Sequence, residues 1–264
     1  MLSFRDIVID ANPTASSEVA WATFDTTIRR WIAETNPDVV LEVGGGRTPL
    51  FSAAEARAAG IARYLVNDVS QAELDRLPPD RERACFDIQT GPPPDADYAG
   101  RCDFVFAHMV FEHLADPAGA WATIHRLLRP GGTAVSFHPV LYSPPFVLNR
   151  ILPERLAERV LRTFFGRRNA DDHPKFPAYY RWCRASPRFV ADRLAPLSFA
   201  SVDVVPFYGH GYFERLPVLR SVDRVVTDVA RRRDVRALAS YAYVIVVKGL
   251  CGAQESTGPG GAAC

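Results

Sequence analysis

The chain has 264 residues, 48% of them hydrophobic, and a formal net charge of +1, which predicts one domain with insertions, or at most two, around a sizeable core. The near-neutral charge gives no general electrostatic reason to expect nucleic acid or a membrane as the main partner. The five cysteines are scattered and form no C-x-x-C pair, which argues against a disulfide framework and a zinc site. Arg5 and Asp6 interrupt the apolar N-terminus where a secretion signal would be continuous, so we expect a cytoplasmic protein.

The first half of the chain alternates between helical and strand-like stretches. Apolar residues at helical spacing, followed by Pro37, predict one helix before the strand "DVVLEV"; they are Ala20, Phe24, Ile28, Trp31 and Ile32. Further buried strands are predicted at "ARYLVND", "RACFDI", "CDFVFAH" and "TAVSFH". One clear helix lies between the last two, and "RPGGT" predicts a turn that ends it. The alternation predicts an α/β fold with a mostly parallel sheet covered by helices on both faces.

The second half of the chain is less regular. Residues from about 140 to 188 are crowded with prolines, aromatics and arginines, and we expect an insertion that forms a substrate lid or wall. Two more strands are predicted at "SVDVVPF" and "YAYVIVVKG", on either side of a helix whose apolar residues include Leu219, Val222, Val226 and Val229. Residues 251–264 are expected to form a disordered tail.

A run of three glycines, Gly44 to Gly46, follows the first predicted strand, where a parallel sheet binds its ligands. A dinucleotide fingerprint would need a third glycine where Pro49 stands, and a P-loop would need G-K-[ST], which is absent. What remains is an E-x-G-x-G pattern that begins at Glu42, followed by a second strand that ends in Asp68. A carboxylate there can accept hydrogen bonds from ribose hydroxyls. The set suits a nucleoside without phosphates and counts against a nicotinamide oxidoreductase.

Several motifs in one order resemble the class I S-adenosylmethionine-dependent methyltransferases. They are "VVLEVGGG", "YLVNDVS", "CFDIQTG", "CDFVFAHMVFEHLADP" and "LLRPGG". Thr48 departs from the family pattern, because many members have a third glycine there. The resemblance implies a Rossmann-like sheet of seven strands with an antiparallel last strand, one domain over residues 1–250, and S-adenosylmethionine as cofactor.

The resemblance also implies roles for single residues. Glu42 would bind the amino group of the cofactor, directly or through water, and Gly44, Gly45 and Gly46 would let the backbone approach its aminoacyl end. Asp68 would hold the ribose diol. The remaining cofactor contacts would be Asp87 at the adenine amino group, Ile88 on the adenine ring and His108 under the sulfonium.

The segment "VFEHL" is similar to part of the ubiquinone-pathway O-methyltransferases, in which glutamates and a histidine hold a metal. The pattern is incomplete, because Met109 replaces the first glutamate and only Glu112 and His113 remain. A hard cation needs several oxygen ligands. We therefore expect no metal and interpret the pair as structural.

Methyl transfer to a hydroxyl needs a base that takes the proton. His138 ends the fifth predicted strand and His108 the fourth, so both are expected to open onto the cofactor crevice, with His138 the more favoured base. Either residue could instead be packed or bonded to the backbone. The chain also lacks an [ND]-P-P-[YF] motif after the fourth strand, which many amino-methylating relatives carry. We therefore expect transfer to oxygen.

The acceptor is expected to meet the end of the insertion. "KFPAYYRWCR" combines aromatic rings with arginines, and Tyr179, Tyr180 and Arg181 are our candidate substrate-binding residues. Such a surface could bind an anionic or sugar-like acceptor, although aromatics and arginines are also ordinary packing residues. We expect a small molecule, either a natural product or a glycan precursor. An S-adenosylmethionine-binding partner subunit without catalysis is the alternative that the sequence leaves open.

Overall fold

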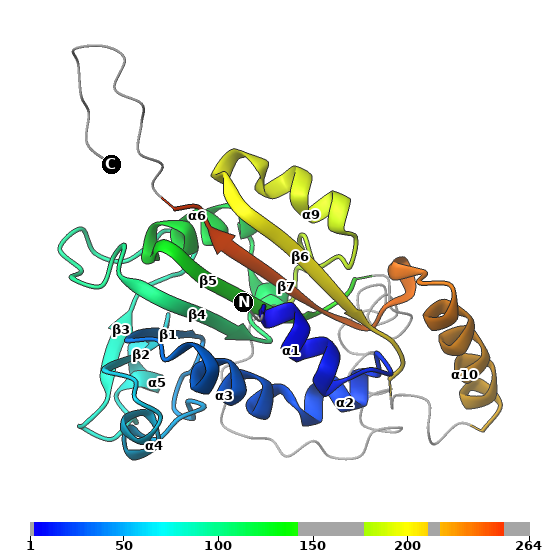
Figure 1. Cartoon of the computed structure of the whole chain (residues 1–264), viewed down its shortest axis with the longest axis horizontal. Helices are drawn as coiled ribbons and strands as arrows, with labels where there is room; N and C mark the ends of the chain where they lie inside the picture. The colour runs from blue at the N-terminus through cyan, green and yellow to red at the C-terminus, as the bar shows by residue number, and fades with distance from the viewer. Residues whose placement is uncertain (1–2, 142–176, 211–216, 251–264) are drawn as a thin grey trace, which may run out of the picture.

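A computed structural model describes residues 3–141, 177–210 and 217–250 of the chain. Its centre is a sheet of seven strands in the order β3-β2-β1-β4-β5-β7-β6 (Figure 1). Strands β1 to β5 pair in parallel, whereas β7 is antiparallel to both β5 and β6. This confirms the predicted fold class. The strands are β1 (Val39–Val43), β2 (Arg63–Asp68), β3 (Glu82–Cys85), β4 (Cys102–His108), β5 (Leu128–Pro139), β6 (Phe199–Phe207) and β7 (Tyr241–Lys248).

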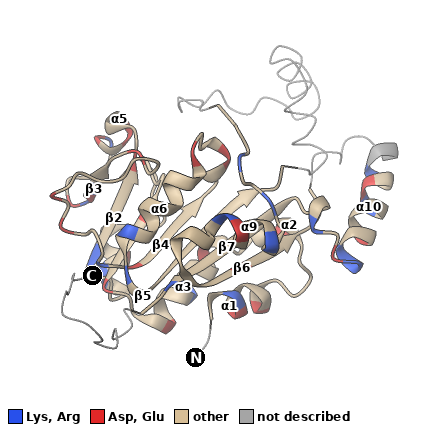
Figure 2. Cartoon of the chain, turned by 90° about the horizontal axis from the view of Figure 1, so that it is seen from above, with Lys and Arg blue, Asp and Glu red and all other residues tan. Residues whose placement is uncertain are grey.

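Helices cover both faces of the sheet (Figure 2). On one face, the Phe4 ring of α1 lies 5.9 Å from Phe104 of β4 and 5.5 Å from Trp31 of α3. On the other face, α6 packs against β5 and α9 against β6. The helices are α1 (Phe4–Ala11), α2 (Ser17–Ala22), α3 (Phe24–Thr35), α4 (Ala53–Ala58), α5 (Gln71–Leu74), α6 (Pro117–Leu127), α9 (Pro187–Leu194) and α10 (Pro217–Arg232). In the part of the chain that the structure describes, no helix is long and apolar enough to cross a membrane.

The helix predicted before β1 is two helices. Thr23 separates α2 from α3 with φ −103° and ψ 2°, and its hydroxyl donates to the Val19 carbonyl at 2.7 Å. The same carbonyl also accepts the Thr23 N–H at 2.9 Å, and a threonine hydroxyl bonded in this way often bends a helix. The predicted end of the helix is confirmed, because α3 stops at Thr35 and Asn36 adopts a left-handed conformation just before Pro37.

The predicted "RPGGT" turn is a bulge at the start of β5. Cys102 pairs with Leu128 and Phe104 with Thr133, so the four residues 129–132 of β5 lie opposite the single residue Asp103 of β4. Gly131 has φ +78°, and a Cβ on Gly132 would lie 2.8 Å from the Cys102 carbonyl. The two strands can therefore approach closely here because these residues are glycines without a Cβ atom.

The C-terminal strands and the helix between them are confirmed as β6, α10 and β7, but α10 stands away from the sheet in both views (Figures 1 and 2). Its apolar residues Val222, Val225, Val226 and Val229 are exposed. The His210 Nε2 atom lies 3.1 Å from an Asp223 carboxylate oxygen and ties α10 to the end of β6. Of the predicted insertion, residues 142–176 lie outside the described residues, as does the predicted tail 251–264.

Candidate active site

The glycine loop after β1 is folded tightly onto β2. The N–H groups of Gly44 and Gly45 both donate to the Asn67 carbonyl, at 2.9 and 3.1 Å. Gly44 and Gly46 have positive φ, which favours glycine. A Cβ on Gly44 would lie 2.5 Å from Val110 Cγ2, and one on Gly45 would lie 2.8 Å from Val66 Cγ1. Two of the three glycines are thus required by the protein's own packing.

Glu42 lies beneath this loop and is 8% exposed. Its carboxylate accepts hydrogen bonds from the Leu50 N–H at 3.0 Å and from the Tyr64 hydroxyl. Burial raises the pKa of Glu42 to about 7. The structure thus gives Glu42 a role in supporting the loop that carries the predicted cofactor contacts.

Asp68 ends β2 beside the same loop. A Cβ on Gly46 would be 3.2 Å from Asp68 Oδ2, and Oδ1 accepts the Ser70 N–H at 2.8 Å. Burial raises the pKa of Asp68, while N–H groups that include that of Gly46 oppose the shift. Close to Asp68, the Arg47 guanidinium binds the Glu73 carboxylate at 2.7 and 3.2 Å. The predicted ribose contact is therefore placed next to the glycine loop.

The predicted adenine contacts lie in a turn just beyond β3. Asp87 Oδ1 accepts the backbone N–H of Gln89 at 2.9 Å, and the Gln89 side chain accepts the Asp116 N–H at 2.6 Å. Ile88 is 5% exposed. Since Asp116 caps the first turn of α6, this turn is fixed to the loop after β4.

His108 ends β4 on the face covered by α2 and α3. Its ring stacks on Phe24 at 4.1 Å and meets Trp21 edge-on at 4.9 Å. Burial lowers the pKa of His108 to about 4, so the ring is neutral at pH 7. Its Nε2 atom has no hydrogen-bond partner among the described residues.

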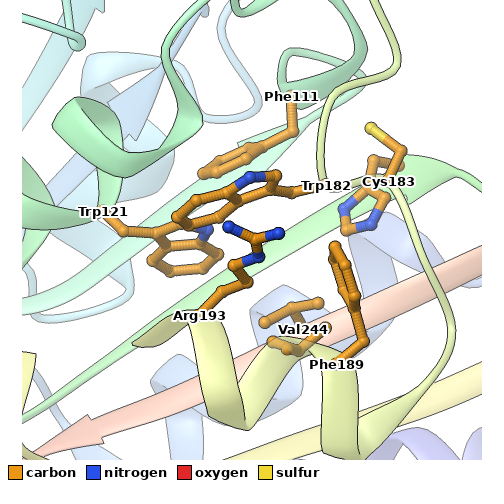
Figure 3. Close-up of a pocket in the computed structure, with 9 residues that line it drawn as sticks. Phe111, Trp121, Trp182, Cys183, Phe189, Arg193 and Val244 are labelled. Atoms are coloured by element: carbon orange, nitrogen blue, oxygen red, sulfur yellow. The ribbon is translucent and has the colours of Figure 1, made fainter. Parts of the chain in front are cut away.

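His138 lies on the opposite face, which corrects the expectation that both histidines open onto one crevice. It is 2% exposed, and its Nδ1 lies 3.1 Å from the Ser136 hydroxyl. Burial lowers the pKa of His138 to about 4. Its Nε2 also has no partner in the described part of the chain. His138 lines a small cavity of about 10 Å³ (Figure 3), together with Phe111, Trp121, Trp182, Cys183, Phe189, Val190, Arg193 and Val244.

The three predicted substrate residues are brought together near this cavity. The N–H groups of Tyr179 and Tyr180 donate to the Glu112 carbonyl at 2.7 and 3.0 Å, and Arg181 donates to the Ala115 carbonyl at 2.6 Å. A second, open pocket of about 490 Å³ is lined by Leu141, Ala178, Tyr179, Tyr180, Arg181, Trp182, Arg184, Phe189 and Arg193. The two pockets share Trp182, Phe189 and Arg193.

The sequence analysis did not identify Phe189 and Arg193, which line both pockets. They come from α9, which follows the predicted insertion. Their spacing of four residues places them on one face of a helix, and this is the signal that could have identified them.

Glu112 and His113, the remnant of the possible metal motif, lie side by side after β4. The Glu112 carboxylate is buried, its pKa is raised to about 7 by burial, and it lies 3.8 Å from His113 Nε2. His113 Nδ1 lies 3.1 Å from the Pro177 carbonyl. No group of three or more potential ligands from His, Cys, Asp and Glu occurs within the described ranges.

A family model described as a methyltransferase domain matches residues 41–136. This segment holds the glycine loop, Asp68, Asp87 and His108, but it ends two residues before His138. No curated protein matches the chain.

Solved methyltransferase structures resemble the fold. One from Archaeoglobus fulgidus, described as dependent on S-adenosylmethionine, has 17% identity and a TM-score of 0.50 over 86% of this chain and 94% of its own. The CMeT domain of a citrinin polyketide synthase has 15% identity and a TM-score of 0.50, over 93% of this chain and 57% of that one. A methyltransferase from Mesorhizobium loti has 14% identity and a TM-score of 0.47, over 83% and 96%.

The matched segment carries the loop and the acidic strand end that suit a nucleoside, and the sheet has the strand order and antiparallel last strand that the motifs imply. Residues 41–136 therefore match a methyltransferase domain, and the chain has the fold of a solved S-adenosylmethionine-dependent methyltransferase.

Proposed function

We propose that the chain transfers a methyl group to an oxygen of a small-molecule acceptor, a natural product or a glycan precursor, in a cytoplasmic setting. The observation that carries this proposal is the position of His138. It is neutral at pH 7, has an unpartnered Nε2 among the described residues, and lines a cavity that shares three residues with the large pocket.

We assign the cofactor contacts from the sequence motifs, and the closeness of Asp68 to the glycine loop supports this assignment. Gly44, Gly45 and Gly46 hold the aminoacyl end, with Glu42 supporting the loop from below and acting on the amino group through water. Asp68 accepts hydrogen bonds from the ribose hydroxyls, and Asp87 and Ile88 face the adenine. When bound, S-adenosylmethionine supplies a methyl group on a cationic sulfonium.

His138 acts as the base in this proposal. As the acceptor oxygen bonds to the methyl carbon and the carbon–sulfur bond breaks, the hydroxyl proton passes to His138 Nε2. The small cavity has about the volume that one water molecule needs, so the proton can travel through one water. His108 packs on the opposite face and takes no proton; it supports the sulfonium end of the site.

The test pairs two measurements on the purified chain. Binding of S-adenosylhomocysteine is followed by calorimetry, and methyl transfer is screened with acceptors matched in shape that present either a hydroxyl or an amine. We expect transfer to hydroxyls that is lost in His138→Ala. Transfer to amines alone would contradict the assignment to oxygen.

A further inference from the structure

The large pocket is cationic as well as aromatic. Arg181, Arg184 and Arg193 all line it, and Arg181 and Arg193 form no ion pair with a carboxylate in the described ranges. The acidic neighbour on α9, Asp192, lies 3.9 Å from Arg188 instead. A pocket of this volume that presents two uncompensated guanidinium groups favours a negatively charged ligand.

Arg193 is held in place by aromatic rings. Its Cζ atom lies 5.6 Å from the centre of the Trp182 ring and 5.4 Å from that of Phe189. Figure 3 shows the guanidinium reaching from α9 toward the Trp182 indole. An arginine held near aromatic rings keeps its planar fork of N–H donors, which suits a carboxylate or phosphate.

The opposite wall has an unusual backbone. Tyr180 has φ +53° and Trp182 has φ +60°, which are uncommon for residues other than glycine. Strain of this kind persists where the surroundings fix it and often accompanies ligand-binding sites. Here the hydrogen bonds from Tyr179 and Tyr180 to the Glu112 carbonyl fix the segment, and the outcome is that Trp182 lies over Arg193.

The wall that carries Tyr180 and Trp182 is also linked to the glycine loop. Val110, whose side chain packs against Gly44, lies two residues before Glu112, whose carbonyl holds the wall. The pocket therefore adjoins the loop after β4 that contacts the glycine loop.

We propose that the pocket binds an aromatic or similarly flat acceptor through an anionic group, a carboxylate, phosphate or sulfate, with Arg193 and Arg181 as the anion contacts and Trp182 and Phe189 on its apolar body. That this ligand is the methyl acceptor rests on the proposed function. The anion preference of the pocket stands apart from it and can be measured directly.

The experiment uses two pairs of probes, 2-naphthoate with 2-naphthamide and 2-naphthyl phosphate with 2-naphthol, titrated into the full chain with S-adenosylhomocysteine present. We expect each anion to bind about tenfold more tightly than its neutral partner. Arg193→Met should remove that preference and leave the neutral probes little changed. Arg193→Lys should restore part of it, because the charge returns without the planar fork.

Arg188→Met is the matched control, since Arg188 lies on the same helix, is exposed and does not line the pocket. It should bind all four probes like the wild type. If Arg193→Met does not fold, Arg181→Met provides the same comparison. Equal binding of anions and neutral probes by the wild type, or an equal loss in Arg188→Met, would overturn the proposal. Failure of S-adenosylhomocysteine to bind would instead contradict the proposed function, while the probes would still report on the pocket.

Discussion

His108 and His138 end neighbouring strands but point to opposite faces of the sheet. His108 pairs in register with Phe137, so the next residue, His138, must face the other way. The contacts agree, because His108 stacks on Phe24 of α3, whereas His138 lies 6.1 Å from the Phe111 ring on the side of α6 and α9. We therefore expect the two histidines to have separate roles.

Replacing His138 is expected to affect chemistry more than binding. His138→Ala should lower the rate of methyl transfer by about 10² to 10⁴ and leave the affinity for S-adenosylhomocysteine nearly unchanged. Single-turnover assays beside thermal melts make the comparison. Loss of stability with a normal rate in the folded fraction would show that His138 is a packing residue.

The pH dependence of that rate follows from the lowered pKa. Because burial lowers the pKa of His138 to about 4, the base is already neutral well below pH 7. The single-turnover rate should rise through about pH 4 and be flat above about pH 6. A rate that still rises through pH 6.5 would indicate a base with an ordinary histidine pKa.

Stability gives an independent check on His108. Its folded pKa of about 4 lies below the ordinary histidine value of 6.5, so the stability that the neutral ring contributes is complete above pH 6.5 and is lost as the pH falls toward 4. His108→Phe keeps an aromatic ring beside Phe24 and removes the pH-dependent part of the stability that comes from His108. The free energy of unfolding of the variant, relative to that of the wild type, should increase by about 1 kcal/mol for each pH unit of acidification between pH 6.5 and pH 4. Urea denaturation at several pH values measures it, and parallel curves would refute the buried neutral ring.

Asp68 is expected to act on cofactor affinity. A carboxylate that accepts two hydrogen bonds from ribose hydroxyls contributes about 2 to 4 kcal/mol, so Asp68→Ala should weaken S-adenosylhomocysteine binding by that amount and Asp68→Asn by less. Calorimetry of the folded variants measures both. Unchanged affinity in Asp68→Ala would place the ribose elsewhere.

The glycine loop can be tested through its neighbour Val110. Gly44→Ala should destabilise the chain by about 1 to 3 kcal/mol, because its Cβ would meet Val110 Cγ2 at 2.5 Å and φ is positive. Adding Val110→Ala should recover part of the loss, since only the steric contact is relieved. Strictly additive effects in denaturation experiments would show that the two residues do not touch.

Much of the fold could be predicted because it depends on local patterns. The central strands are largely apolar, Asp68 ends its strand, and the glycines follow β1 directly in the sequence. The face of each histidine could not be predicted, because it depends on strand register between β4 and β5. Arg193 was missed for a similar reason, since it joins Trp182 only through the packing of α9. The break at Thr23 was missed because apolar spacing continues across it.

Titration of the purified chain with S-adenosylhomocysteine, with NAD as the comparison, shows which nucleoside cofactor the glycine loop binds. We expect saturable binding of S-adenosylhomocysteine and no binding of NAD. The reasons are the glycines that pack against Val110 and Val66, the carboxylate beside them, and Pro49 in place of a third glycine. Asp68→Ala should weaken that binding in the same experiment. Binding of NAD without binding of S-adenosylhomocysteine would contradict the account.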